Sequence, residues 1–307
     1  MTNVTTRLRG LWLPLITPFR DGALDEPSLR NLVRHYAAKP IDGLVLGATS
    51  GEGLALSWDE RARLISVVRD ELDTIGRPLP ICLGVGGVAT AEVIEALDRT
   101  ASWPIDFYLI SSPPYVRPSQ RGLLAHFTAL ADRTVHPIVL YNIPYRSAVG
   151  LDNETLLQLA EHPAIAGLKD CCANRTQTRD LITRRRAGFH ILTGEDAQSF
   201  DALQAGADGA ILLSAHLETE TFATILQHVK AGRHDAAAAC WALVEHLTRL
   251  LFTEPSPAPA KYWLARTGVI ASPEVRLPMV EVGAELAARL DQQIERRQPT
   301  TTQNRVA

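Results

Sequence analysis

Apolar runs alternate with longer amphipathic segments over the first 232 residues of the chain. The apolar runs occupy residues 11–17, 43–49, 80–86, 106–112, 137–144, 164–170, 189–195 and 209–215. Segments with apolar residues at helical spacing follow them at 29–39, 60–72, 91–101, 120–133, 153–162, 177–187, 197–206 and 220–232. Runs that are apolar throughout are typical of parallel strands covered on both faces. Eight strand–helix pairs over this length predict an α/β fold, a (β/α)8 TIM barrel.

An open, doubly wound sheet is the alternative arrangement of the same elements. Such sheets usually carry a glycine-rich turn after the first strand. Here that turn reads TPFRDG, at residues 17–22, and it contains neither GxGxxG nor a P-loop. The closed barrel is therefore the better prediction.

After residue 230 the pattern becomes wholly helical. Helical spacing covers residues 234–252, 260–268 and 278–297, with a proline-rich break at 254–260. We predict a barrel domain at 1–230, a C-terminal helical domain at 231–295, and a disordered, mostly polar tail at 296–307.

Composition narrows the range of partners. Of the 307 residues, 46% are hydrophobic and 21% are charged, which suits a soluble globular protein with a large core. Lysine and arginine number 31 against 34 acidic residues, so no basic excess is available to bind nucleic acid. The N-terminal residues are polar, and the apolar stretch after them is interrupted by Pro14 and Pro18. This pattern predicts neither a signal peptide nor a membrane span, and we expect a cytoplasmic protein.

The cysteines suggest no disulfide framework and no zinc site. Cys82, Cys171, Cys172 and Cys240 show no CxxC spacing, and two of them are adjacent. We interpret all four as small buried apolar residues.

Functional side chains of such barrels lie at the carboxyl ends of the strands and in the loops that follow. Those positions hold Thr17, Thr49, Ser50, Gly51, Glu52, residues 111–115, Tyr141, Asn142, Arg146, Lys169, Gly194, Glu195, Ser214 and His216. A catalytic metal needs several His, Asp or Glu ligands at one point. Only His216, Glu52 and Glu195 are available, so we expect no metal site.

Lys169 ends the run AIAGLKD, which reads as a buried strand. An ammonium group is costly to bury unless it is paired or loses its proton. A desolvated lysine has a lowered pKa, and its neutral amine can form a Schiff base with a ketone or aldehyde. The alternative is a strand-end lysine that pairs with Asp170 or reaches solvent.

Neighbouring loops offer groups that imine chemistry requires. Tyr141 ends the preceding apolar run and could move protons, although a core tyrosine would look the same. The segment ATSGEG, at 48–53, could bind a carboxylate through hydroxyls and backbone amides, or could be an ordinary tight turn. Arg146 follows Tyr141 in the same loop and could hold a second carboxylate.

Taken together, these motifs resemble those of a known family. They read LWLPLITPF (11–19), ATSGE (48–52), PPYVRPSQ (113–120), YNIPYR (141–146), GLKD (167–170) and LFTEPSPAPAKYWLARTG (251–268). The chain resembles the class I, Schiff-base-forming, pyruvate-dependent aldolases, which include dihydrodipicolinate synthase and N-acetylneuraminate lyase. The resemblance covers all but the two ends of the chain.

The resemblance implies a role for each matching residue. Lys169 would form the imine, Tyr141 would act as acid and base, and Thr49 would relay protons to a second tyrosine. That second tyrosine, Tyr115, would reach into a neighbouring subunit's site. The predicted substrate-binding residues are Ser50, Arg146, Gly194 and Ile211, with Ser50 on the carboxylate of pyruvate. No cofactor is implied beyond the covalent pyruvate imine on Lys169, and the expected assembly is a homotetramer, a dimer of dimers.

The aldehyde partner is the open question. Arg146 favours the dihydrodipicolinate synthase branch, in which the matching arginine holds the carboxylate of aspartate semialdehyde. Ala48, Pro114 and His216 depart from the usual family pattern near the expected pocket, as does Ser50 in place of a threonine. Two alternatives are retro-aldol cleavage of a 2-keto-3-deoxy sugar acid or N-acetylneuraminate, and a sensor barrel that binds a keto acid without turnover.

Overall fold

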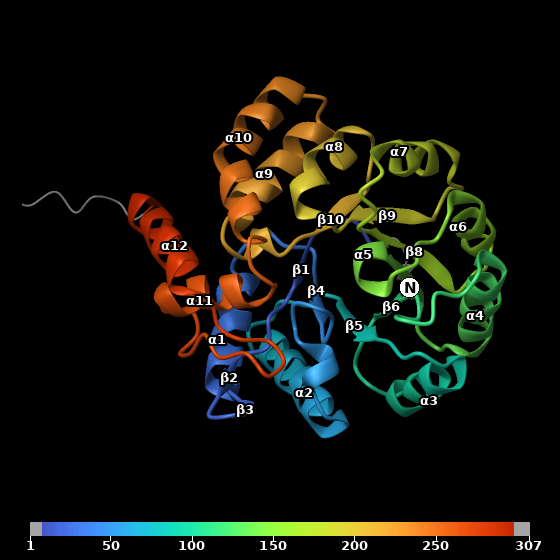
Figure 1. The fold of residues 1–307 in the computed structure, drawn as a ribbon, viewed down its shortest axis with the longest axis horizontal. Helices are drawn as coiled ribbons and strands as arrows, with labels where there is room; N and C mark the ends of the chain where they lie inside the picture. Colours follow the sequence, from blue (N-terminus) through green and yellow to red (C-terminus); the bar gives the residue numbers. More distant parts are fainter. Residues whose placement is uncertain (1–7, 298–307) are drawn as a thin grey trace, which may run out of the picture.

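The computed structural model describes residues 8–297, and its centre is a closed barrel of eight parallel strands (Figure 1). The strands are β1 (Gly10–Pro14), β4 (Gly43–Leu46), β5 (Ile81–Val85), β6 (Phe107–Ser111), β7 (Ile138–Asn142), β8 (Ile165–Asp170), β9 (His190–Thr193) and β10 (Gly209–Ile211). Each strand pairs with its neighbours in chain order, and β1 closes the barrel by pairing with both β4 and β10. The predicted (β/α)8 barrel is confirmed.

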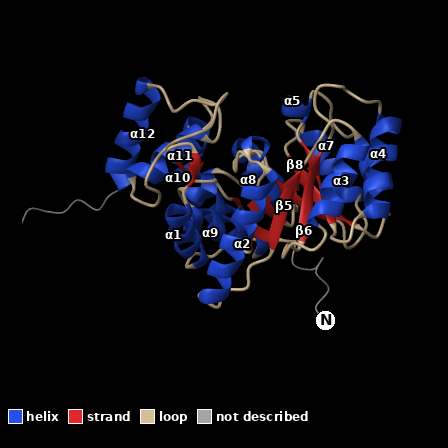
Figure 2. Ribbon diagram, turned by 90° about the horizontal axis from the view of Figure 1, so that it is seen from below, coloured by secondary structure: helices blue, strands red, loops and turns tan. Residues whose placement is uncertain are grey.

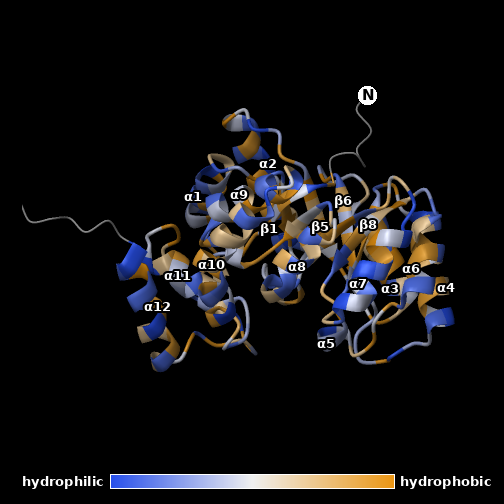
Figure 3. Ribbon diagram, turned by 90° about the horizontal axis from the view of Figure 1, so that it is seen from above, coloured by the Kyte–Doolittle hydropathy of each residue, from blue (hydrophilic) through white to orange (hydrophobic). Residues whose placement is uncertain are grey.

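Helices surround the strands on the outside of the barrel. They are α1 (Glu26–Ala37), α2 (Trp58–Thr74), α3 (Thr90–Thr100), α4 (Gln120–Arg133), α6 (Asn153–Ala160), α7 (Arg175–Arg184), α8 (Ser199–Gln204) and α9 (Thr219–Lys230). Side-chain caps define several starts: Ser57 and Glu60 form a capping box on α2, and Asp152 accepts from Thr155 N on α6. The helices carry both hydrophilic and hydrophobic residues (Figure 3), as expected for helices that cover a sheet with one face.

Side chains fill the barrel interior. Trp12 and Phe107 meet edge to face, with ring centroids 5.8 Å apart, and both are fully buried. The same interior cluster includes Tyr141, Cys171 and Ile211 at the carboxyl ends of their strands. The floor of any site at this end is therefore packed core rather than an open channel.

The chain ends in a helical appendage beside the barrel. It contains α10 (His234–Leu250), α11 (Ala258–Arg266) and α12 (Ala284–Arg297). These helices share an apolar cluster of Leu247, Leu250, Leu251, Trp263, Leu286, Leu290 and Ile294. Helices α11 and α12 lie at the same end of the barrel as the short helix α5 (Pro144–Ser147) (Figure 2). The appendage thus stands where the strands have their carboxyl ends.

Several boundary predictions change. Helix α12 continues to Arg297, so residues 296 and 297 are helical and do not belong to the predicted tail; residues 298–307 lie outside the described part. Residues 278–283, predicted as helical, precede α12 and are not helical. A small hairpin of β2 (Phe19–Arg20) and β3 (Ala23–Leu24) was not predicted, because its strands are too short to show a pattern.

The cysteines are less uniformly buried than predicted. Cys82 and Cys171 are buried as predicted, whereas Cys172 and Cys240 are only partly buried, and all four are free thiols.

Between residues 8 and 297, no helix combines the length and the apolar character that crossing a membrane requires.

Candidate active site

Lys169 and Tyr141 lie side by side at the carboxyl ends of β8 and β7. The two residues are partners in the strand register, and the Lys169 Nζ atom lies 4.4 Å from the centroid of the Tyr141 ring. Lys169 is only 5% exposed. The alternative in which this lysine reaches solvent is therefore wrong.

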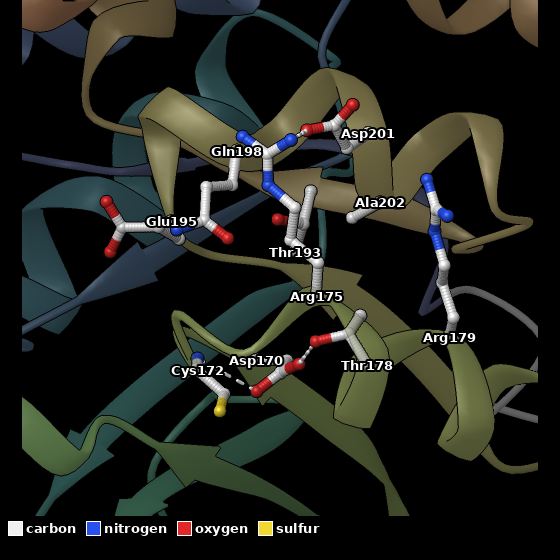
Figure 4. Close-up of a pocket in the computed structure, with 10 residues that line it drawn as sticks. All are labelled: Asp170, Cys172, Arg175, Thr178, Arg179, Thr193, Glu195, Gln198, Asp201 and Ala202. Atoms are coloured by element: carbon white, nitrogen blue, oxygen red, sulfur yellow. Dashed lines mark hydrogen bonds and ion pairs between the residues drawn. The ribbon is translucent and has the colours of Figure 1, made fainter.

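Asp170 accepts hydrogen bonds from other groups and does not pair with Lys169. Its carboxylate accepts hydrogen bonds from Thr178 Oγ1 (2.6 Å), the Cys172 backbone N–H (3.0 Å) and Asn142 Nδ2 (3.3 Å). In Figure 4 Asp170 lines a small pocket at the ends of β8 and β9, where Arg175 forms an ion pair with Asp201 at 2.5 Å. That pocket has a volume of about 20 Å³, and neither Lys169 nor Tyr141 lines it. It is therefore separate from the lysine.

The electrostatic surroundings of Lys169 favour its neutral form. Burial lowers the pKa of its ammonium and Arg146 adds to the shift, while the nearby Asp196 opposes it. The Cys171 thiol is itself buried, which raises its pKa and keeps it protonated. A lysine with a lowered pKa supplies a larger fraction of free amine at neutral pH, which is the nucleophilic form.

Most of the predicted site residues meet in one cavity. It has a volume of about 30 Å³ and is lined by Pro14, Thr49, Ser50, Tyr141, Tyr145, Arg146, Lys169, Gly194, Asp196, Ile211, Leu213, Phe252 and Ser256. These residues come from strand ends or following loops and from the segment between α10 and α11. The barrel topology brings them together although they are distant in the chain.

A larger cleft of about 360 Å³ opens next to this cavity. Thr49, Tyr141 and Arg146 line both spaces. The opposite wall of the cleft comes from the appendage, including Pro257, Arg276 and Met279. The lysine is therefore reached from a space that can hold small organic substrates.

Tyr141 is arranged as a proton donor. Burial raises the pKa of its phenol well above the ordinary value, while the neighbouring Thr49 side chain opposes that shift. Both residues line the inner cavity. A phenol that stays protonated can donate to a developing alkoxide or amine, and Thr49 can pass the proton on.

Arg146 presents a guanidinium to the cleft. It lies on α5 and its side chain is exposed, with the Cζ atom 5.6 Å from the centroid of the Tyr145 ring. It makes no ion pair with a carboxylate of residues 8–297. Its planar fork is thus available to a substrate carboxylate.

Asp196 is a site residue that the sequence reasoning missed. It is buried, and its Oδ1 atom accepts from the Ser214 backbone N–H (2.7 Å) and from Ser214 Oγ (2.5 Å). The predicted strand-end positions of this loop ended at Glu195, one residue earlier. No local pattern distinguishes Asp196 from an ordinary loop residue, because its partner Ser214 lies 18 residues further along the chain.

Tyr115 lies outside both cavities of its own chain. Its side chain is 89% exposed, and its backbone has a φ of 74°, in the left-handed region. Within one chain it cannot serve Lys169. Pro114, the residue before Tyr115, does line the cleft.

Of the four departures from the family pattern, three line the cleft or the inner cavity and one does not. Ala48 and Pro114 line the cleft, and Ser50 lines the inner cavity. His216 is 3% exposed and lines neither cavity; its ring packs edge to face on Tyr36, with centroids 5.2 Å apart. The prediction that His216 lies near the pocket is wrong, because the 3₁₀ turn at 214–216 directs it into the core between β10 and α1.

His216 makes the stability of the protein sensitive to acid. Burial lowers the pKa of its imidazole to about 4, from 6.5. Between about pH 4 and pH 6.5, His216 is therefore protonated in the unfolded chain but neutral in the folded chain. The folded protein loses stability as the pH falls below about 6.5. The variant His216→Asn removes this titration. Between about pH 7.5 and about pH 5, both proteins should lose unfolding free energy, and the loss should be about 2 kcal/mol smaller in the variant than in the wild type.

Urea unfolding at both pH values measures this difference. Comparing the pH change within each protein cancels the cost of the smaller side chain. The other histidines with lowered pKa values, His35 and His126, are present in both proteins and also cancel. Equal losses of stability in the two proteins would contradict the prediction.

Comparisons with known proteins agree with this geometry. Residues 7–297 match the model of the dihydrodipicolinate synthetase family. The chain is 40% identical over 287 residues to 4-hydroxy-tetrahydrodipicolinate synthase 2 of Clostridium acetobutylicum, covering 93% of this chain and 99% of that protein. It is 38% identical to the 4-hydroxy-tetrahydrodipicolinate synthase of Limosilactobacillus fermentum, covering 93% and 90%. Among solved structures, dihydrodipicolinate synthase from Aquifex aeolicus superposes with a TM-score of 0.89 at 27% identity, covering 94% of this chain and 98% of that one.

Proposed function

The chain belongs to the dihydrodipicolinate synthetase family, a family of lyases, and we propose that it condenses pyruvate with aspartate semialdehyde through an imine on Lys169. The observation that carries this proposal is the buried lysine beside Tyr141, in a cavity that opens to a cleft. The neighbouring Asp170 is engaged elsewhere, so the amine has no structural partner in that carboxylate.

The chemistry follows from the neutral amine. Lys169 attacks the ketone carbon of pyruvate, and loss of one water gives an imine. The protonated imine withdraws electrons, so the methyl carbon loses a proton and becomes the nucleophilic carbon of an enamine. That carbon attacks the aldehyde and forms the new carbon–carbon bond, while the aldehyde oxygen takes up a proton. The amino group of the semialdehyde then displaces Lys169 from the imine carbon, which closes the ring and frees the lysine.

Tyr141 and Thr49 would serve the proton transfers in these steps. The Tyr141 ring lies against the lysine amine, and Thr49 lines the same cavity. The Tyr141 phenol can protonate the departing hydroxyl during imine formation and the aldehyde oxygen during condensation. No cofactor is needed in this scheme, since the imine itself serves as the electron sink.

Ser50 and Arg146 would bind the two carboxylates. Ser50 lines the inner cavity beside Lys169, where the carboxylate of pyruvate would lie. Arg146 lines both the cavity and the cleft, so its guanidinium can reach a substrate that enters from the cleft. Gly194 and Ile211 would shape the wall around the pyruvate carbon atoms.

Direct assay of the two reactions tests the proposal. Purified protein is incubated with pyruvate and aspartate semialdehyde, and the heterocyclic product is followed by mass spectrometry. Pyruvate release from N-acetylneuraminate and from a 2-keto-3-deoxy sugar acid is measured in parallel. We expect kcat/KM for the condensation to exceed that for either cleavage by at least about 100-fold, because Arg146 suits a carboxylate whereas Tyr145 and Leu213 offer little to sugar hydroxyls. Faster cleavage of a sugar acid would identify that compound as the substrate. Binding of pyruvate without any turnover would indicate a keto-acid sensor.

Tyr115 supports a further proposal about assembly. Its exposed ring sits beside a residue of the cleft, so we propose that it completes the site of a neighbouring subunit in a cytoplasmic homotetramer. Mixing a Tyr115→Phe variant with a Lys169→Ala variant tests this contact. Recovered activity after subunit exchange supports it, and no recovery in a proven mixed oligomer contradicts it.

A further inference from the structure

A tight turn places a buried carboxylate next to the proposed catalytic hydroxyls. In the loop after β4, the Glu52 backbone N–H donates to Thr49 O at 3.1 Å, and Gly53 N–H donates to Ala48 O at 3.1 Å. Glu52 has a φ of 49°, in the left-handed region, and is only 7% exposed. The backbone of Glu52 is therefore tied to that of Thr49 in a closed turn that also contains Ser50.

The appendage binds both oxygens of this carboxylate. Lys261 of α11 is fully buried, and its Nζ atom lies 2.5 Å from Glu52 Oε1. The second oxygen, Oε2, accepts from the Arg276 backbone N–H at 2.9 Å. Lys261 also donates to Glu274 O at 2.7 Å and lies 4.2 Å from the centroid of the Phe19 ring. Glu52 is thus held entirely by residues that follow the barrel in the chain.

The Arg276 side chain makes further contacts between the same segment and the barrel. It pairs with Glu60 at the start of α2 (2.5 Å) and donates to Ala55 O (2.9 Å). Its guanidinium lies 4.2 Å from the Phe19 ring, on which Lys261 also rests. The segment therefore contacts the barrel at Glu52 in the turn and at Ala55 and Glu60, which follow the turn in the chain.

Stability alone does not require this buried ion pair. Desolvation of two charges offsets most of their attraction, and neutral side chains of similar shape are often as stable. Burial also lowers the pKa of Lys261 to about 8, which shows how far the site disfavours the charge. Neutral side chains would not reproduce the short ion pair that holds the Glu52 carboxylate against α11.

We propose that Lys261 is a positioning residue, which holds Glu52 and through it sets the position of Thr49 and Ser50 in the active site. The appendage thereby takes part in the arrangement of groups around Lys169 although α11 supplies none of the reacting atoms. This inference rests on the proposed function, because it assigns those two hydroxyls to proton relay and carboxylate binding.

The decisive variant is the double substitution Glu52→Gln with Lys261→Met. Each single change leaves a buried charge or an unpaired polar group and is expected to lower Tm, whereas the double change removes both charges together. We expect the double variant to regain most of the lost Tm but to retain a kcat/KM for pyruvate lower by about 10-fold, since small displacements of catalytic groups cost rate steeply. Wild-type kcat/KM in a double variant of wild-type Tm would overturn the proposal.

Two further variants keep the test informative if the double variant does not fold. Glu52→Asp preserves the charge but shortens the side chain by one methylene, so it should draw the turn toward Lys261 and lower kcat/KM; unchanged kcat/KM would overturn the proposal. The matched control is Glu218→Gln with Arg297→Met, which removes another ion pair between appendage and barrel (2.5 Å) away from this turn. This control should keep the wild-type kcat/KM, and a loss as large as that of the Glu52 variants would overturn the proposal.

Trapping of pyruvate separates the two levels of inference. Borohydride reduction of the wild type with pyruvate should give a covalent adduct if the proposed function holds. If the wild type gives no adduct, the proposed function fails. If it does and the Glu52 and Lys261 variants match its kcat/KM, only the positioning role fails.

Discussion

Lys169→Ala is expected to abolish the pyruvate adduct and to lower kcat/KM for condensation by at least about 10⁴-fold. The amine is the only proposed covalent link to substrate, and removing a nucleophile takes away the entire covalent route. Intact-protein mass spectrometry after incubation with pyruvate and borohydride measures the adduct. The wild type should gain one reduced pyruvate per chain, and the variant none.

The chain offers a matched control for this prediction. Lys230 stands at the end of α9 and is exposed, so Lys230→Ala should leave the adduct and the rate unchanged. Lys169 differs from it in being buried with a lowered pKa. An adduct that persists in the Lys169→Ala variant would place the imine on another amine and remove the basis of the proposed mechanism.

Gly194→Ala should lower kcat/KM by about 100-fold while the protein remains folded. A methyl group at this position would lie 2.5 Å from Lys169 Cε, 2.8 Å from Lys169 Cγ and 2.7 Å from Cys171 Sγ. Real Cβ atoms essentially never make contacts that short, so the lysine side chain would have to leave its present position beside Tyr141. Displacing a reacting atom by about 1 Å can cost about 100-fold in rate. Steady-state kinetics and the rate of adduct formation with borohydride measure the effect.

Gly122→Ala is the control for this substitution. Gly122 lies in α4, and an added methyl group would make ordinary contacts of 3.4 and 3.5 Å with Pro118 and Ser119. Since alanine favours helix over glycine, this variant should keep its activity with equal or higher stability. A Gly194→Ala variant with the wild-type rate would mean that the lysine can adopt a second productive position.

Local patterns in the sequence were enough to predict the barrel fold and to single out Lys169. Apolar runs with helical segments between them predict the barrel because parallel strands must be apolar on both faces. Lys169 stood out for the converse reason, since a charged group at the end of such a run needs an explanation. Once the barrel was predicted, its geometry implied that Thr49, Tyr141 and Lys169 meet at one end.

The errors of the sequence reasoning share a physical cause. His216 follows a strand, and nothing in the residues around it indicates that a 3₁₀ turn directs it into the core. Asp196 lies three residues beyond the end of β9, and it is bonded to Ser214, a residue of the next strand's loop. In both cases the direction of a side chain is set by partners that become neighbours only on folding.

The order of strands and helices, the barrel that they form and the lysine at its carboxyl end follow from burial patterns repeated along the chain. The surroundings of that lysine depend on the folded chain: the clearance at Gly194, the hydrogen bonds to Asp170 and the exposure of Tyr115. The contact of Glu52 with Lys261 of the appendage depends on it as well. Hydrogen bonds and ion pairs act over a few ångströms and require defined directions, so pairs of residues distant in the chain become visible only when the packed chain brings them together.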